Sequence, residues 1–175
     1  MHAILVNEKQ DLVWNEVPDP APKADEILVE IHAAALNRAD LMQRAGNYPP
    51  PPGCPEWMGL EVAGVVLEAP TDSRWKAGDR VCALLGGGGY AERVAVPAGM
   101  ALPVPEGLSM VEAAAIPEAF ATSYVNLCME GGMKAGDTVL IQAGASGLGM
   151  AAIQLAKTLG AKVMTTVSTE EKAAF

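Results

Sequence analysis

The stretch TVLIQAGASGLG (138–149) decides the fold of the second half of the chain. Its first six residues form a continuous run that is typical of a strand buried on both faces of a sheet. Residues Gly144 to Gly149 predict a tight turn before a helix, and the backbone amides and dipole of such a helix start favour a pyrophosphate group. The turn matches the dinucleotide fingerprint GxGxxG at Gly144, Ser146 and Gly149, with serine at the middle position.

The residues after this turn complete a supersecondary unit. Residues 150–159 predict a helix that Gly160 ends, residues 162–167 predict a second buried strand, and Thr169 is placed to cap a further helix. This order of elements is a βαβ unit. A glycine-rich pattern alone also fits a purely structural turn. The βαβ context favours a dinucleotide site instead, whose residues at the turn are Gly144, Ser146, Gly147, Leu148 and Gly149.

The end of the second predicted strand lacks the carboxylate that is usual in NAD sites. Such an acid lies about 20 residues after the fingerprint and holds the ribose hydroxyls, but Val167 and Ser168 occupy this region here. Without a carboxylate nothing repels a 2′-phosphate, to which Ser168 can donate a hydrogen bond and Lys172 a charge. The pattern favours NADPH over NADH. The alternative is that Lys172 is a solvated helix lysine that balances Glu170 and Glu171.

The first hundred residues have the pattern of short strands separated by turns. Between Glu26 and Ala33, Ile27, Val29 and Ile31 fall on one face of a strand. Asn37 is placed to cap a short helix over 38–45. This spacing predicts a compact antiparallel β barrel or sandwich, whose strands are expected over 3–6, 12–17, 26–33, 61–68, 80–85 and 90–96.

Helical character begins after Pro105. The segment Ser109-Met110-Val111-Glu112 has the spacing of a capping box, and it opens an alanine-rich stretch that predicts helix as far as Met129. Pro117 is expected to break or kink this helix near its middle.

Composition and charge exclude several classes of protein. The 175 residues include 12 Lys and Arg against 21 Asp and Glu, a net charge of −9, which argues against nucleic acid as a partner. No apolar run approaches the ~20 residues of a membrane-spanning helix, and the first residues do not resemble a signal peptide. Cys54, Cys82 and Cys128 are widely spaced, and only two histidines accompany them, so neither a disulfide framework nor a zinc site is expected. These features favour a cytoplasmic protein.

Four longer stretches carry a family resemblance: ALNRADLMQRAGNYPPPPG (35–53), GLEVAGVV (59–66), PEGLSMVEAAAIPEAFAT (105–122) and VLIQAGASGLGMAAIQLAKTLGA (139–161). They resemble the medium-chain dehydrogenase/reductase superfamily, specifically its zinc-independent quinone oxidoreductases of the tumour-suppressor-inducible type. The resemblance implies an α/β protein with a β-rich first domain. A GroES-like β barrel for substrate and catalysis is expected over 1–120. The amino-terminal part of an NADP-binding Rossmann domain is expected over 121–175, with the first βαβ of an incomplete doubly wound parallel sheet.

The resemblance also assigns roles to single residues. Tyr48 is expected to face the nicotinamide and the quinone, to donate a hydrogen bond and to stack its ring. The alternative is a purely structural role, in which Tyr48 is a turn aromatic that packs on the prolines at 49–52. Ser146 matches the glycine-loop serine that contacts the cofactor and assists substrate placement, so Tyr48 and Ser146 are the expected catalytic residues. Asn37 and Thr122 match polar positions near the nicotinamide.

The zinc ligands of related alcohol dehydrogenases are missing. Asn37, Leu60 and approximately Glu118 stand where those enzymes have cysteine, histidine and cysteine, and the structural zinc lobe is absent around 85–90. Leucine cannot bind zinc, so no metal site is expected. Without zinc an ordinary carbonyl is poorly polarised, but a quinone accepts hydride with little more than positioning and a hydrogen bond.

Together these features predict a zinc-independent oxidoreductase that transfers hydride from NADPH to a small quinone or related electrophilic carbonyl. The family pattern continues beyond Phe175, so we expect the chain to be an amino-terminal portion, inactive by itself and from a homodimer when whole. Two alternatives remain open. One is a catalytically incompetent fragment that acts as a GroES-like association module, and the other is an NADPH-dependent reductase of enones or enoyl thioesters.

Overall fold

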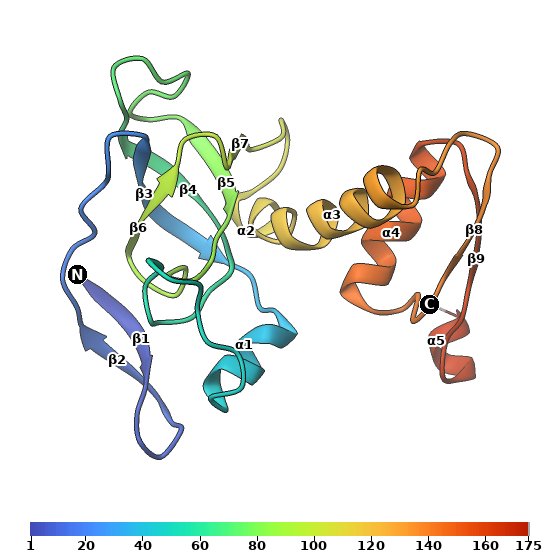
Figure 1. The fold of residues 1–175 in the computed structure, drawn as a ribbon, viewed down its shortest axis with the longest axis horizontal. Helices are drawn as coiled ribbons and strands as arrows, with labels where there is room; N and C mark the ends of the chain where they lie inside the picture. The colour runs from blue at the N-terminus through green and yellow to red at the C-terminus, as the bar shows by residue number, and fades with distance from the viewer. Residues whose placement is uncertain (175) are drawn as a thin grey trace. The chain divides into compact units, whose positions relative to one another are not determined.

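The computed structural model describes residues 1–174, which fold as two compact units (Figure 1). The first unit is Met1–Pro117, and the second runs from Glu118 onward. The expected domain boundary at residue 120 therefore falls inside helix α3, Pro117–Tyr124.

The first unit is built on one antiparallel sheet with the strand order β6-β3-β4-β5-β7. Beside it lies the hairpin of β1 (His2–Val6) and β2 (Leu12–Glu16), tied to the rest by a bridge between Ala3 and Ala91. The sheet curls into a half-barrel (Figure 1). Its strands are β3 (Glu26–Ala34), β4 (Glu61–Glu68), β5 (Arg80–Leu84), β6 (Arg93–Pro97) and β7 (Ala101–Pro103).

The core of this unit confirms the alternation predicted for 26–33. Ile27 and Val29 are both completely buried and belong to one cluster with residues of the neighbouring strands, among them Val62, Val81 and Val96. Period-two alternation therefore identified the inward face of β3 correctly.

Two strands of the sheet differ from the prediction. Strand β6 begins at Arg93 and not at residue 90, because the backbone N–H of Tyr90 donates to Met58 O and its side chain is used elsewhere. Strand β7 was not predicted, because three residues ending in a proline are too few to show the alternation of apolar and polar side chains that marks a strand.

The predicted capping box at Ser109 is present at the start of helix α2, Met110–Ala114. The Ser109 N–H donates to Glu112 Oε2 at 2.9 Å, and the Glu112 N–H donates to Ser109 Oγ at 3.3 Å. The long helix predicted to Met129 is divided: α2 ends before Pro117, α3 starts at it, and a π-helix, η1, continues over Val125–Glu130. Proline at the first helical position explains the division.

The second unit contains the predicted βαβ arrangement. Strands β8 (Thr138–Ile141) and β9 (Lys162–Thr165) are parallel, and helix α4 (Gly147–Thr158) connects them. A short helix, α5 (Glu170–Ala174), follows. Helix α4 begins three residues earlier than predicted, because Ser146 is its N-cap and glycines of the turn enter its first turn.

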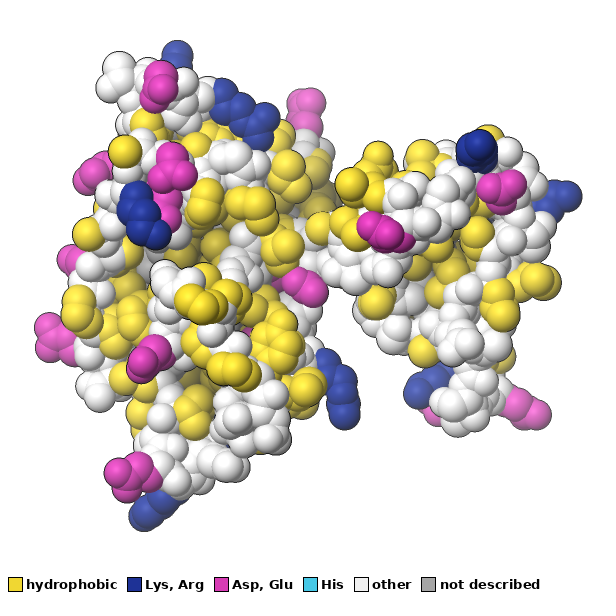
Figure 2. Space-filling model, viewed as in Figure 1, with side chains coloured by type: hydrophobic (Ala, Val, Ile, Leu, Met, Phe, Trp, Pro, Cys, Tyr) yellow, Lys and Arg dark blue, Asp and Glu magenta, His cyan; other side chains and the backbone are white. Residues whose placement is uncertain are grey.

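The apolar sequences of both strands are typical of burial on both faces, but two parallel strands with one covering helix leave apolar faces exposed. Leu140 is 60% exposed and Met164 is 56% exposed. Among the described residues β8 and β9 pair only with each other, and Ala152 and Ala156 of α4 form their cluster with Ile141. The outer apolar side chains of the two strands therefore meet solvent. Apolar side chains are visible on the surfaces of both units (Figure 2). No helix within residues 1–174 is long and apolar enough to cross a membrane.

The close pairing of β3 and β4 gives a prediction about Gly64. A Cβ atom at Gly64 would overlap the carbonyl oxygen of Glu30, which is backbone and cannot move aside easily. We expect Gly64→Ala to lower the free energy of unfolding of the first unit by about 2 kcal/mol or more, measured by urea denaturation. Gly99→Ala is the matched control, because a Cβ there meets nothing within 4 Å. Equal stability of the two variants would contradict this packing.

Candidate active site

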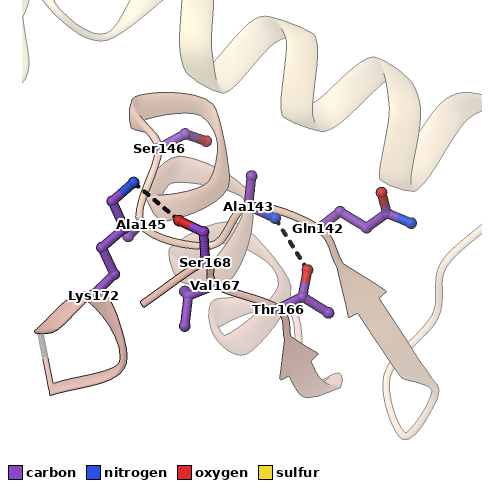
Figure 3. A pocket seen from close by; sticks show the side chains of 8 residues that line it. All are labelled: Gln142, Ala143, Ala145, Ser146, Thr166, Val167, Ser168 and Lys172. Carbon is purple, nitrogen blue, oxygen red and sulfur yellow. Dashed lines mark hydrogen bonds between the residues drawn. The ribbon is translucent and has the colours of Figure 1, made fainter. Parts of the chain in front are cut away.

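An open pocket of about 370 Å³ lies at the glycine-rich turn of the second unit. It is formed where β8 ends, where α4 begins and where the chain leaves β9 (Figure 3). The position is the one at which open parallel sheets bind ligands, outside the carboxyl ends of the strands. Its lining residues are Gln142, Ala143, Ala145, Ser146, Thr166, Val167, Ser168 and Lys172.

The turn is tied to the residue that follows β9. The Gly144 N–H donates to Thr166 O at 3.0 Å, and the Ala143 N–H donates to Thr166 Oγ1 at 3.3 Å (Figure 3). Ala143 has a φ of 54°, which a non-glycine residue adopts only when its surroundings hold it there. Thr166 was not singled out from the sequence, because the strand predicted over 162–167 included it, whereas strand β9 ends at Thr165.

Ser146 caps helix α4. Its Oγ accepts a hydrogen bond from the Gly149 N–H at 3.0 Å. The first amides of a helix have no acceptor within the helix, so the N–H groups of Gly147 and Leu148 are available to an anion. The Ser146 hydroxyl hydrogen also remains available, because the capping bond uses only a lone pair of the oxygen.

The three glycines of the turn have different steric surroundings. A Cβ at Gly149 would overlap Ala143 O, and a Cβ at Gly144 would overlap Thr165 Oγ1. Glycine is required at both positions for the helix to approach the strands. A Cβ at Gly147 would meet nothing within 4 Å. The fold itself therefore leaves open space beside Gly147, at the amino end of α4.

Ser168 and Lys172 lie together at this pocket. Lys172 Nζ donates to Ser168 Oγ at 3.3 Å, and the two side chains point toward one another (Figure 3). Thr169 begins the short helix that carries Lys172, with its Oγ1 accepting from the Lys172 N–H at 3.3 Å. Neither Glu170 nor Glu171 is among the lining residues. The polar groups of the pocket are therefore neutral or basic.

A second cluster of polar side chains surrounds Asn37 in the first unit. Asn37 is the N-cap of helix α1, Arg38–Arg44. Its backbone N–H donates to Asp40 Oδ2 at 2.6 Å, and its side-chain Nδ2 donates to Glu61 Oε1 at 2.9 Å. Asp40 is 6% exposed and Glu61 is 3% exposed. Asp40 and Glu61 were not singled out from the sequence, although the Asn-x-x-Asp spacing at 37–40 was a signal for the first of them.

Tyr90 completes this cluster. Its hydroxyl donates to Asp40 Oδ2 at 2.7 Å. Burial is the main cause that raises the pKa of Tyr90, and the hydrogen bond to Asp40 and the nearby charges of Asp40 and Glu61 raise it further. The phenol therefore stays protonated and remains a donor at every physiological pH.

Tyr48 and Thr122 are not among the residues that line the pocket at the glycine turn. Tyr48 belongs to the first unit, is 41% exposed and lines a groove of about 510 Å³ that Pro49, Pro50 and Trp57 also line. Pro49 and Pro50, on which a purely structural Tyr48 would pack, therefore line the same groove, while much of the Tyr48 ring remains accessible. Thr122 is on α3, where its Oγ1 donates to Glu118 Oε1 at 3.5 Å, and it does not line the pocket. Only Ser146, Ser168 and Lys172 of the expected side-chain ligands line that pocket.

The positions compared with zinc ligands hold no metal-binding cluster. Leu60 is buried and has no donor atom, and the Asn37 side chain is engaged by Glu61. Within residues 1–174, no group of three or more His, Cys, Asp or Glu residues could hold a metal ion.

Comparison with known proteins assigns the family. Residues 23–106 match the alcohol dehydrogenase GroES-like domain. The quinone oxidoreductase of Thermus thermophilus, whose crystal structures include an NADPH complex, superposes with a TM-score of 0.82 at 39% identity, covering 98% of this chain and 55% of that one. This chain belongs to the medium-chain dehydrogenase/reductase superfamily.

Other members of this superfamily match over most of the chain. The human quinone oxidoreductase is 36% identical over 160 residues, 90% of this chain and 48% of that protein. The crystal structure of CurK enoyl reductase superposes with a TM-score of 0.87 at 27% identity, covering 99% of this chain and 56% of that one. The chain spans between 6% and 48% of the lengths of curated relatives that it matches. The first unit contains the GroES-like domain, and the chain is related to oxidoreductases.

The steric difference between the glycines gives a prediction for the second unit. Gly149→Ala forces the amino end of α4 away from the turn that follows β8, because the new Cβ overlaps Ala143 O. We expect a loss of about 2 kcal/mol in the stability of this unit, seen as faster amide exchange in α4 by NMR. Gly147→Ala is the control and should leave exchange unchanged or slower, since its Cβ enters open space. Similar exchange in both variants would contradict the assigned packing.

Proposed function

We propose that this chain is the amino-terminal portion of an enzyme that transfers hydride from NADPH to a quinone without a metal ion. The observation that carries the proposal is the pocket at the amino end of α4. Its lining contains Ser146, Ser168 and Lys172 and no carboxylate residue. Such a lining suits a cofactor with a pyrophosphate and a 2′-phosphate, and repels neither.

The residues of the second unit fit this cofactor group by group. The free amides at the start of α4 and the Ser146 hydroxyl would bind the pyrophosphate, and the open space beside Gly147 would admit it. Lys172 Nζ and Ser168 Oγ are 3.3 Å apart, so both could donate to one 2′-phosphate. The NADPH complex of the Thermus thermophilus relative supports the choice of cofactor.

In the first unit the proposed reaction depends on Tyr48. Bound NADPH supplies the hydride. The Tyr48 hydroxyl would donate a hydrogen bond to the quinone oxygen that becomes negatively charged, and its exposed ring would stack on the quinone. The apolar wall that Leu5 and Trp57 form in the same groove would keep water from this face of the ring. The quinone oxidoreductases among the relatives support a quinone as acceptor.

We propose that the reaction needs no metal ion. Leu60 has no donor atom at the place of a zinc ligand, so a chelator should leave the rate of the complete enzyme unchanged. We also propose that the enzyme is cytoplasmic, that its substrate is a small quinone or related electrophilic carbonyl, and that the complete protein forms a homodimer.

A second candidate function is the NADPH-dependent reduction of enones or enoyl thioesters. The similarity to CurK enoyl reductase favours it. Delivery of hydride to a conjugated carbon uses the same cofactor pocket, so a panel of quinones, enones and enoyl thioesters separates the two candidates by kcat/KM. The third alternative, a non-catalytic association module, is excluded if the chain binds NADPH tightly.

Cofactor preference is tested at Lys172. Lys172→Ala removes the charge opposite the proposed 2′-phosphate, so we expect NADPH to bind about tenfold more weakly while NADH binding stays the same. Fluorescence titration of the chain with each cofactor measures this. Lys157→Ala, an exposed lysine of α4 outside the pocket, is the control. Equal loss of NADPH and NADH affinity would count against a 2′-phosphate site.

The role of Tyr48 is tested in the complete enzyme. Tyr48→Phe keeps the ring and removes the hydroxyl, so we expect kcat for quinone reduction to fall by about tenfold or more with little change in NADPH affinity. Stopped-flow oxidation of NADPH measures the rate. Tyr124→Phe, an exposed tyrosine of α3, should react like the unmodified protein. An unchanged rate in Tyr48→Phe would remove Tyr48 from the mechanism.

A further inference from the structure

Ala143, in the turn between β8 and α4, has a backbone conformation that its own side chain disfavours. Its φ is 54°, in the left-handed region that residues with a Cβ rarely adopt. Ala143 is exposed, so close packing around its methyl group is not what selects this conformation. Hydrogen bonds to its peptide groups therefore have to select it.

Thr166 supplies one of these hydrogen bonds through its side chain. Thr166 Oγ1 accepts from the Ala143 N–H at 3.3 Å (Figure 3). The backbone of Thr166 is engaged separately, because its carbonyl oxygen accepts from the Gly144 N–H at 3.0 Å and its N–H donates to Ile141 O at 3.1 Å. Replacement of the Thr166 side chain therefore removes the bond to Ala143 and leaves the backbone bonds in place.

The carbonyl group of Ala143 links this residue to helix α4. Its oxygen accepts from the Ser146 N–H at 2.9 Å, and it lies where a Cβ at Gly149 would overlap it. A change in φ at Ala143 rotates this carbonyl relative to the strand that precedes it. The place of the amino end of α4 thus depends on the conformation that Ala143 adopts.

We propose that Thr166 is a positioning residue, whose hydroxyl holds Ala143 in the left-handed conformation and so keeps the amino end of α4 ready to bind the pyrophosphate of the cofactor. This role rests on the proposed function, in which that helix end binds the pyrophosphate. Thr166 lines the same pocket. Its hydroxyl hydrogen is also free to donate, so direct contact with the cofactor is the alternative that the experiments have to separate.

The first test observes the turn in the free chain by NMR. Thr166→Val replaces the hydroxyl with a methyl group of similar size, so residues 143–146 should exchange between two conformations and their amide resonances should broaden or double. Thr166→Ser keeps a hydroxyl and should keep single, sharp resonances. Thr138→Val is the matched control, because Thr138 is exposed at the start of β8. Unchanged resonances of residues 143–146 in Thr166→Val would overturn the proposal.

The second test compares the binding of two cofactors by fluorescence titration. Thr166→Val should weaken NADPH and NADH binding alike, by about fivefold, the value of one ordinary hydrogen bond. The reason is that only part of the chains then has the turn in its binding conformation, and both cofactors contain the pyrophosphate. Lys172→Ala differs, since it should affect NADPH alone. A loss confined to NADPH in Thr166→Val would place its effect at the 2′-phosphate and contradict the proposal.

The third test is a double-mutant cycle with Ala143→Gly. Glycine adopts a positive φ without the steric cost of a Cβ, so the conformation no longer needs the hydroxyl of Thr166. In this background Thr166→Val should weaken NADPH binding by at most about twofold. An equal loss in both backgrounds would mean that Thr166 contacts the cofactor directly or supports the fold in general, and the inference would be wrong.

The outcomes separate this inference from the proposed function. If the unmodified chain binds neither NADPH nor NADH, the proposed function fails and the ligand-directed part of the role fails with it. The spectra of the free chain still decide whether Thr166 holds Ala143. Thermal unfolding checks that each variant folds, and Thr166→Ala, which removes the same hydroxyl, replaces Thr166→Val if valine prevents folding.

Discussion

The second unit depends on how closely helix α4 approaches the end of strand β8. Gly149 lies against the carbonyl of Ala143, and Gly144 lies against Thr165, so that neither position has room for a Cβ. This contact brings the amino end of α4, with its free amides and its Ser146 cap, to the place where both strands end. A wider approach would replace the anion site by an ordinary helix start. The pocket is thus a consequence of backbone packing, and Lys172 adds charge to a site that the backbone has already formed.

The first unit contains two buried carboxylates, Asp40 and Glu61, next to the partly exposed Asn37. Burying an ionised acid is unfavourable unless hydrogen bonds satisfy it. Asp40 Oδ2 receives two donors and Glu61 receives the Asn37 amide, whereas the buried Asp40 Oδ1 receives no donor. Apolar residues would fill the same interior without this desolvation, but the two acids join the start of α1 to strand β4 and to Tyr90. In the proposed function, phosphate binding belongs to the second unit and the hydrogen bond from Tyr48 belongs to the first.

Sequence reasoning succeeded where the decisive contacts are local. The alternation at Ile27 and Val29, the capping box at Ser109 and the turn between β8 and α4 are determined within a few residues, and all three are present. The sequence-based predictions were wrong where contacts between residues far apart in the sequence determine burial or side-chain partners. Apolar strand sequences at 138–141 and 162–165 predict burial on both faces, but burial depends on what else packs on the sheet, and Leu140 and Met164 are exposed. Tyr90 and Asp40 are 50 positions apart, so no local pattern could pair them.

The proposed function requires that the amino end of α4 binds the phosphates of NADPH. The most direct measurement is an NMR titration of the isotope-labelled chain with NADPH, following every backbone amide. We expect the largest shifts at residues 144–149, with further shifts at Thr166, Ser168 and Lys172. Shifts that are absent at saturating NADPH, or that appear elsewhere while the turn stays unchanged, would contradict it.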